Sequence, residues 1–399
     1  MTYTGYLGRL APTLALATAL AHGAPDAPRV PPELREAADA AIARGIDWLV
    51  ENQQPGGAWS NTNYPALTAL PLWAIVRQHD DALKPAIDKA VAYILSCVHT
   101  TGSHRGAIFH PIPGQRSGGY VNYNTALSII PLHALDDPEL VPVILGAREF
   151  LARSQHLDPE SLHYGGMGYD PTVDRDYADL ANSFTAYEAM HLTRGVEELR
   201  TAGGHVDLDW QAALTFIQRI HNHPEFNSLA WATDHPDEKG GFTYRPDAYR
   251  PDFGAFEDED GVLRYRSAPA MSHAGLLSYL YAGVERDDPR VRSTFAWIRD
   301  HWDLSQGNRN PELAGKPDAL GGLYFMYLFK ARAMDHYGED ILTPSDGPAI
   351  AWREDMIRAI TERQSDDGYW ANPYGRYWES DPVLVTAYAL LALQSALGR

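Results

Sequence analysis

Three aspartates lie together in front of one apolar segment. Asp174, Asp176 and Asp179 fall within six residues, directly before the apolar run from Leu180 to Thr193. A carboxylic acid can give a proton to a substrate when neighbouring charges or hydrogen bonds adjust its pKa. These residues are therefore candidate catalytic acids. Asp179 has a second interpretation, because an aspartate directly before a helix also caps it by accepting backbone N–H groups.

A second acidic pair precedes the last apolar run of the chain. Asp381 stands directly before the run from Pro382 to Leu397, and Glu379 lies two residues earlier. Acids of the two clusters could serve a carbohydrate-active lyase or hydrolase: Asp174, Asp176, Glu379 and Asp381. Such an enzyme would need an open groove with two facing carboxylates, roughly 5 to 9 Å apart.

No motif in the chain indicates a cofactor, and the histidines at 99, 104 and 110, or at 221 and 223, are only a weak metal signal. The sequence has no Gly-x-Ser-x-Gly, no His-Glu-x-x-His, no phosphate-binding loop and no dinucleotide fingerprint. The single cysteine, Cys97, can form neither an intramolecular disulfide nor a thiolate metal cage, and we predict that it is buried. We interpret the acidic run 257–260 as a solvated loop, with a calcium site as the alternative. We expect no cofactor and no bound metal.

The charge and the N-terminus bear on partners and location. The formal net charge of -19 argues against binding to nucleic acid or to an anionic membrane surface. Arg9, an apolar run to Ala21 and the small-x-small end Ala19-Leu20-Ala21 resemble a secretory leader. We predict a signal peptide and linker over residues 1–24, and therefore a periplasmic or secreted protein. If this leader does not direct export, we expect a cytoplasmic protein. No later stretch is long and apolar enough to span a membrane. The oligomeric state stays open.

A repeated helical unit must position these residues. Residues 48–59 read as a helix end, a Pro-Gly-Gly turn and a tryptophan, and a second apolar helix follows at once. Related units recur around Gly166–Tyr169 and Gly368–Trp370, and looser ones around Gly118–Tyr120, Gly240–Phe242 and Gly321–Tyr324. A helical hairpin cannot bury its apolar face alone, whereas six hairpins can close into one ring. We therefore predict an all-α fold of six helical hairpins over residues 25–399.

The apolar patterning distinguishes two sets of helices. We expect outer helices over 33–52, 85–99, 142–155, 209–221, 291–302 and 355–363. We expect inner helices over 64–78, from 122, and over 180–193, 271–282, 323–337 and 382–397. The inner set is poor in charge, as expected for helices that line the inside of a ring.

The repeated unit resembles that of a known superfamily. An aromatic and an aliphatic residue, three spacers, a glutamine and then Gly-x-Trp, as at Trp48–Trp59, are similar to the repeat of squalene–hopene and oxidosqualene cyclases. The fuller resemblance is to bacterial single-toroid proteins with prenyltransferase/squalene-oxidase repeats. It implies an (α/α)6 toroid, an aromatic-lined apolar cavity and an isoprenoid ligand. Ligand contacts are predicted at the following residues: Tyr123, Asn182, Phe184, His273, Tyr324 and Trp378.

The resemblance also implies a mechanism, and the chain departs from it. These cyclases protonate an alkene with an Asp-x-Asp-Asp-Thr motif at the start of an inner helix. Asp179 matches the first aspartate, but Ala181 replaces the proton donor and Asn182 replaces the third. Three functions therefore stay open: a cyclase-like protein that binds or transforms an isoprenoid, a non-catalytic secreted binding protein, and a carbohydrate-active toroid.

Overall fold

The computed structural model describes residues 30–112, 114, 119–172 and 176–399, and the leader and Asp174 lie outside this part. Within it the chain forms twelve α-helices. The outer helices are α1 (Pro32–Glu51), α3 (Lys84–Ser96), α5 (Val141–Ser154), α7 (Trp210–Arg219), α9 (Pro289–Asp300) and α11 (Trp352–Thr361). The inner helices are α2 (Ala66–Val76), α4 (Val121–Ala134), α6 (Leu180–Leu192), α8 (Pro269–Tyr281), α10 (Leu323–Tyr337) and α12 (Pro382–Ala396).

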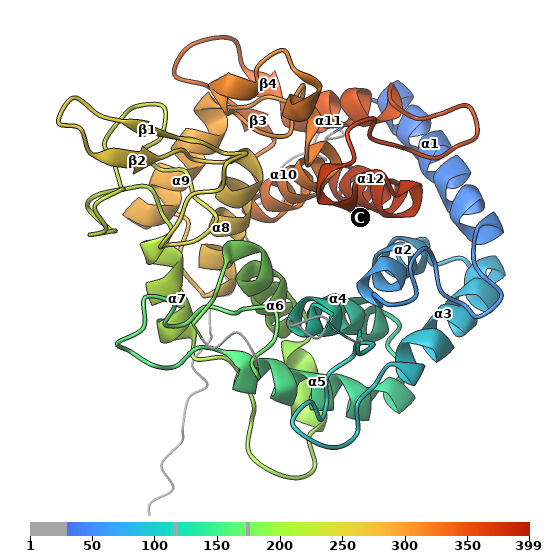
Figure 1. Cartoon of the computed structure of the whole chain (residues 1–399). Coiled ribbons are helices and arrows are strands. Elements are labelled where there is room, and N and C mark those ends of the chain that lie inside the picture. Colours follow the sequence, from blue (N-terminus) through green and yellow to red (C-terminus); the bar gives the residue numbers. More distant parts are fainter. Residues whose placement is uncertain (1–29, 113, 115–118, 173–175) are drawn as a thin grey trace, which may run out of the picture.

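The six hairpins close into a ring. Each inner helix packs against the next one along the chain, and α12 packs against α2 (Figure 1). The outer helix α1 contacts both α11 and α12, so that the first helix closes the ring against the last hairpin. The predicted all-α ring of six hairpins is therefore confirmed. None of the described helices is long and apolar enough to cross a membrane.

Burial explains why the two sets of helices differ in sequence. Every residue of α2 is buried, and α12 is buried from Val383 to Ala396, since these helices have neighbours on all sides. An outer helix such as α7 buries only one stripe, formed by Ala212, Ala213, Phe216 and Ile217. Cys97 is buried and free, as predicted.

A serine or threonine of the inner helix anchors the turn in five hairpins. Its hydroxyl accepts the backbone N–H of a loop residue just after the glycine turn. The pairs are Trp59 with Thr68, Ile108 with Thr125, Met167 with Ser183, Phe242 with Ser272, and Trp370 with Thr386, at 2.9–3.1 Å. Each hydroxyl thus satisfies a backbone group that burial would otherwise leave unpaired.

A glycine in the same turn seats each of these five hairpins on the next outer helix. Gly165 has φ +89°, and a Cβ built there would lie 1.8 Å from the carbonyl oxygen of Ala212 in α7. Gly368, at φ +94°, lies in the same way against Arg44 of α1, which joins the sixth hairpin to the first. Only glycine tolerates both this backbone conformation and this close approach. Gln155 and Gln364 strengthen these seams by donating to the turn and to the next outer helix.

Two expected turns are placed differently. In the second hairpin the anchored turn is at Gly106, whereas Gly119 and Tyr120 directly precede α4. In the fifth hairpin Gly321 and Gly322 lie at the start of α10, and the part of this loop that the structure describes has no Ser/Thr anchor. The glycine-aromatic pattern alone could not separate a turn from a helix start, because glycine suits both.

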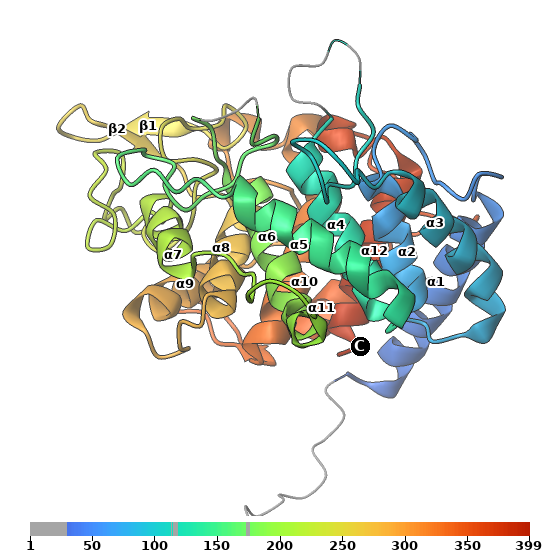
Figure 2. The ribbon, with the colours of Figure 1, turned by 90° about the horizontal axis from the view of Figure 1, so that it is seen from below.

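The two faces of the ring differ. The connections from outer to inner helices lie on one face, which we call the mouth, and the chain's C-terminus lies on the other (Figure 2). The longest insertion, between α7 and α8, carries the small hairpin of β1 (Ala255–Glu257) and β2 (Leu263–Tyr265) at the periphery. A second short pair, β3 (Ile341–Leu342) and β4 (Ile350–Ala351), precedes α11.

Candidate functional site

Aromatic side chains form an arc around the mouth. Trp378 packs edge-on against Tyr64, with ring centroids 4.9 Å apart, and Tyr64 lies 5.6 Å from Tyr120. Tyr169 continues the arc at 5.0 Å from Tyr120, and Tyr177 stacks on it at 5.6 Å. We call these five residues the aromatic arc. It joins the loops of the first, second, third and sixth hairpins.

The backbone is strained at this place. Six non-glycine residues of the described chain have positive φ, and four of them lie at the mouth: Ser60, Tyr120, Tyr377 and Trp378. Such conformations cost about 1 to 3 kcal/mol each and collect at functional sites. Trp378 is also 43% exposed, which is unusual for so large an apolar side chain.

Asp179 is fully buried beneath the arc and caps α6. One carboxylate oxygen accepts the backbone N–H of Asn182 and the other accepts its side-chain amide, both at 2.8 Å. The hydroxyls of Tyr177 and Tyr244 donate to the same carboxyl group. Burial raises the pKa of Asp179, and these hydrogen bonds oppose the rise. The capping interpretation is confirmed, and the cap explains the presence of both Asp179 and Asn182.

The other predicted acids are dispersed. Asp176 is exposed on the loop before α6, and Asp174 lies outside the described residues. Asp381 caps α12 by accepting the N–H of Val383 at 2.9 Å, and it also accepts the hydroxyl of Ser60. The carboxylates of both helix starts are thus held by backbone and neighbouring side chains.

Glu379 replaces the missing anchor of the fifth hairpin. Its buried carboxylate accepts the N–H of Phe325 at 2.8 Å and those of Leu323 and Tyr324, the first residues of α10. The amide of Asn372 also donates to it. Burial raises the pKa of Glu379 to about 7, although these hydrogen bonds favour the ionised form. A carboxyl group of the next hairpin therefore fixes the α10 end that lacks its own anchor.

A strap from the α7–α8 insertion crosses this side of the mouth. We give this name to residues 244–252. Arg250 lies over the rings of Tyr244 and Tyr377, at 4.5 and 5.1 Å. Asp252 accepts hydrogen bonds from Arg376 and from the hydroxyl of Tyr377. The hydroxyl of Tyr244 lies 3.2 Å from that of Tyr169, which ties the strap to the aromatic arc.

A small polar cavity opens beside the strap. Its volume is about 180 Å³, and three loops line it through Pro251, Asp252, Asn308, Leu313, Asp318, Gly321, Tyr374, Arg376 and Tyr377. Carboxylates, an amide, a guanidinium and phenol groups meet here. The cavity lies at the fifth hairpin, where the repeat pattern is broken. Departures from a local pattern are expected where function requires them.

Side chains of the inner helices fill the ring below the mouth. Phe184 of α6 packs on Phe329 of α10 at 4.8 Å. One turn deeper, Glu188 forms a buried ion pair with Arg332, whose guanidinium lies 4.5 Å over the ring of Trp73 in α2. Because α2, α6 and α10 alternate around the ring, this pair lies at its axis. The floor of the mouth is therefore close to the first two turns of the inner helices.

The remaining predicted ligand residues fall in different places. Tyr123 is half-buried and hydrogen-bonded to Tyr388 at the floor. Tyr324 is buried beside Tyr327 at the start of α10. His273 is buried away from the axis, near Trp302 and Lys330, with its Nδ1 2.7 Å from the carbonyl oxygen of Pro269. The structure thus brings Trp378, Phe184 and Tyr123 towards the mouth and its floor, and it leaves His273 in the wall.

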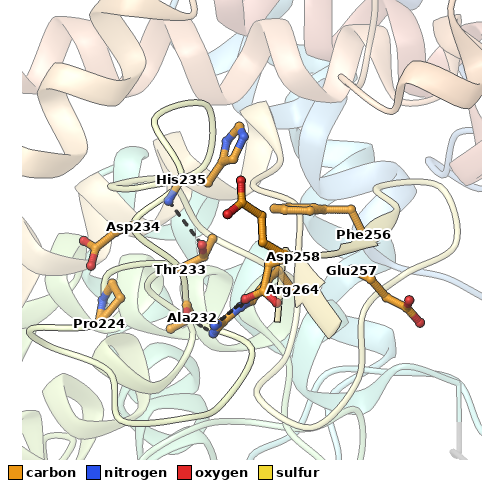
Figure 3. A pocket seen from close by; sticks show the side chains of 10 residues that line it. Pro224, Ala232, Thr233, Asp234, His235, Phe256, Glu257, Asp258 and Arg264 are labelled. Carbon is orange, nitrogen blue, oxygen red and sulfur yellow. Dashed lines mark hydrogen bonds and ion pairs between the residues drawn. The ribbon is translucent and has the colours of Figure 1, made fainter. Parts of the chain in front are cut away.

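A larger hollow lies on the outer insertion, not at the mouth. It measures about 650 Å³ and is lined by Asp234, His235, Phe256, Glu257, Asp258 and Arg264 among others (Figure 3). Asp258 accepts the N–H groups of Asp260 and Val262 and the guanidinium of Arg264, so it closes the β1–β2 turn. The described residues contain no group of acids and histidines arranged to hold a metal ion. The acidic run is a solvated turn.

Solved structures of distant sequence share the ring. The type II terpene cyclase MstE from Scytonema, in complex with its product merosterolic acid A, is 12% identical with a TM-score of 0.54, over 92% of this chain and 98% of its own. Cellobiose 2-epimerase from Spirochaeta thermophila has the same identity and score, over 91% and 98%. The α-1,6-mannanase GH76A of Salegentibacter is 12% identical with a TM-score of 0.52, over 92% and 98%. The chain is an α/α-toroid.

At this identity the likeness shows the fold of the toroid and not its activity. No protein-family model matches the chain. No curated protein matches it in sequence. What the toroid binds is therefore determined by the residues of its mouth.

Several of these residues were not among the sequence predictions. Tyr64 lies in the loop before α2, whereas Tyr244, Arg250 and Asp252 lie in the strap, and no spacing relates the two loops. The sequence signal that remains is composition, since the strap itself, residues 244–252, has two tyrosines and two arginines among its nine residues.

Proposed function

We propose that this toroid binds a saccharide at its mouth without transforming it. The observation that carries the proposal is the pairing of the aromatic arc with the polar cavity. Aromatic faces such as that of Trp378 pack against the C–H faces of sugar rings, while carboxylates, amides and phenols bind their hydroxyl groups. The predicted leader agrees with export from the cytoplasm. We therefore propose that this saccharide-binding protein is periplasmic or secreted.

The filled interior of the ring supports a compact ligand. Phe184, the fifth residue of α6, packs on Phe329 roughly 8 Å along the helix from its start, at about 1.5 Å per residue, so side chains occupy the axis from there on. The Glu188–Arg332 pair blocks the axis beneath it. An extended isoprenoid chain would need a longer apolar channel than this.

The states of the carboxyl groups support binding rather than catalysis. Asp179 and Asp381 cap helices, and Glu379 holds the start of α10. Asp252 is paired with Arg376. Each of these four acids already accepts hydrogen bonds, whereas a hydrolase needs one acid and one base free to act on the glycosidic bond.

A second candidate ligand is a cyclic isoprenoid. The supporting observation is the apolar wall at the floor, where Ala181, Tyr123 and Phe325 remain partly exposed inside the ring. MstE, which shares the fold, has been solved with geranylgeranyl dihydroxybenzoate. Because Ala181 stands where the cyclases have their proton donor, this candidate is also a binding function.

Isothermal titration calorimetry tests both candidates. The mature protein is titrated with cellobiose, with an α-1,6-mannobiose and with geranylgeraniol in detergent. We expect a saccharide to bind with heat that Trp378→Ala abolishes, at an unchanged melting temperature. Trp48→Ala is the matched control, because Trp48 packs at a tilt against Tyr369 in the outer wall, with ring centroids 5.1 Å apart.

The outcomes separate the candidates. Binding of geranylgeraniol alone would favour the isoprenoid and reject the saccharide. Release of monosaccharide during the titration would show that the protein is an enzyme. Equal loss of binding in the Trp378 and Trp48 variants would mean that the mouth is not the site.

A further inference from the structure

The strap carries an arginine whose hydrogen-bonding capacity is unused. Among the described residues none accepts a hydrogen bond from the Arg250 guanidinium, and its Nε is buried without a partner. Its side chain is only 27% exposed. Buried donors in native structures are almost always paired, so the unpaired Nε requires an explanation; the only carboxylate near the guanidinium in the described part of the chain is that of Asp252, in a loose ion pair at 3.8 Å.

Its neighbours hold the guanidinium in place without using it. The rings of Tyr244 and Tyr377 lie 4.5 and 5.1 Å from its central carbon, which fixes its position through cation–π contact. The nearest carboxylate, Asp252, is 3.8 Å away, beyond hydrogen-bond distance. Asp252 already accepts two N–H groups of Arg376 and the hydroxyl of Tyr377.

Arg245 at the other end of the strap shows the contrast. Its guanidinium also lies over a tyrosine ring, that of Tyr177, at 4.6 Å. However, it donates to both oxygens of Asp247. One strap thus carries a satisfied arginine and an unsatisfied one, and the unsatisfied one adjoins Pro251 and Asp252 of the polar cavity.

We propose that Arg250 binds an oxyanion of the ligand, so that the toroid prefers an acidic saccharide. A planar guanidinium with free N–H groups matches a carboxylate or a sulfate ester by two parallel hydrogen bonds. A ligand with one acidic group suits the site, because the formal net charge of -19 repels polyanions. This inference rests on the proposed saccharide-binding function and names its ligand class.

The test compares ligands that differ in one group. Cellobiose, cellobiouronic acid and cellobiose 6-sulfate are titrated into the wild-type protein by calorimetry. A charge-assisted hydrogen-bond pair corresponds to roughly tenfold tighter binding or more. We expect an acidic disaccharide to bind at least about tenfold more tightly than cellobiose, and the better of the two identifies the oxyanion.

Variants assign the preference to Arg250. We expect Arg250→Gln to equalise the acidic and neutral ligands, Arg250→Lys to keep part of the preference, and Arg245→Gln to leave it unchanged. Loss of the preference in Arg245→Gln to the same extent would indicate general electrostatics and would overturn the inference. A preference that survives in Arg250→Gln would overturn it as well.

The design separates failure of the inference from failure of the proposed function. Equal affinity of the wild type for cellobiose and for both acidic disaccharides overturns the inference and leaves saccharide binding intact. If no disaccharide binds, the proposed function itself fails. The wild-type comparison needs no variant, so it decides the matter even if Arg250→Gln does not fold.

Discussion

The buried ion pair at the ring axis should behave differently from a surface pair. Arg332 donates to both carboxylate oxygens of Glu188, and the hydroxyl of Tyr281 donates to the same group at 3.0 Å. Their side chains are 10% and 2% exposed. Replacing one partner leaves a buried charge uncompensated, which typically costs about 3 to 5 kcal/mol. We therefore expect Arg332→Met to reduce the free energy of unfolding by about that amount.

Replacing both partners should cost much less. In Glu188→Leu/Arg332→Met no charge remains buried, and the main loss is the acceptor of Tyr281, about 1 to 2 kcal/mol. With each single change costing about 3 to 5 kcal/mol, the double-mutant cycle should then give a coupling energy of at least about 4 kcal/mol. Adding Tyr281→Phe should recover part of the remaining loss. The matched control is Lys84→Met, which removes an exposed pair with Asp88 and should leave the free energy of unfolding nearly unchanged.

Urea unfolding at pH 7, followed by both circular dichroism and tryptophan fluorescence, measures these energies. Coincident transitions are required before the two signals are read as one free energy of unfolding. If Arg332→Met cost under about 1 kcal/mol, or if the two single changes were simply additive, the pair would not be buried as described. The ion pair would then not block the ring axis, and a longer ligand could enter the ring.

Three further predictions concern the anchor, a carboxyl group and the leader. Thr68→Val should destabilise the protein by about 1 to 3 kcal/mol in the same urea assay, because the buried N–H of Trp59 loses its acceptor, whereas Thr68→Ser should be close to neutral. The folded pKa of Glu379, about 7, lies above its unfolded value, so its proton stabilises the folded state at low pH and stability is lost as the pH rises from about 4.5 through 7. We expect the difference in unfolding free energy between pH 5 and pH 8 to shrink by up to about 3 kcal/mol in Glu379→Gln, and an unchanged pH profile would contradict a raised pKa. N-terminal sequencing of protein exported from its natural host should begin at His22, and an intact Met1 would reject the predicted leader.

The fold could be predicted from the sequence because its causes are local and repeated. The period of apolar residues, the glycine turns and the prolines and aspartates before helices all recur, and each fixes one hairpin. Asp179 was predicted to be an acid or a cap and Asp381 an acid, and the structure shows both as caps. Local sequence can locate such a residue, but it cannot say how many hydrogen bonds saturate its carboxylate.

The mouth could not be predicted because no local pattern encodes it. Tyr64, Tyr177, Tyr244 and Trp378 meet only when four hairpins are placed around one axis. The loop of the fifth hairpin shares the glycine pattern of the repeat through Gly321-Gly322. The start of its inner helix α10 is nevertheless held by Glu379 from the sixth hairpin. Apart from Trp378, which the family resemblance indicated, the residues most relevant to function were thus those on which the repeat gives no information.

The seam between Gly368 and Arg44 joins the last hairpin to the first and so closes the ring. Each described hairpin, including the first and the last, has a neighbour on both sides, so the toroid has no terminal repeat at which unfolding would start most easily, as an open solenoid has. Arg399 and Asp39 form an ion pair across this seam, so the two ends of the ring lie close together. A circular permutant that joins residue 399 to residue 32 by a short linker and opens instead in the exposed turn between α8 and α9 would keep every inter-hairpin contact. In such a molecule the order of the hairpins along the chain would change, while the mouth would remain the same.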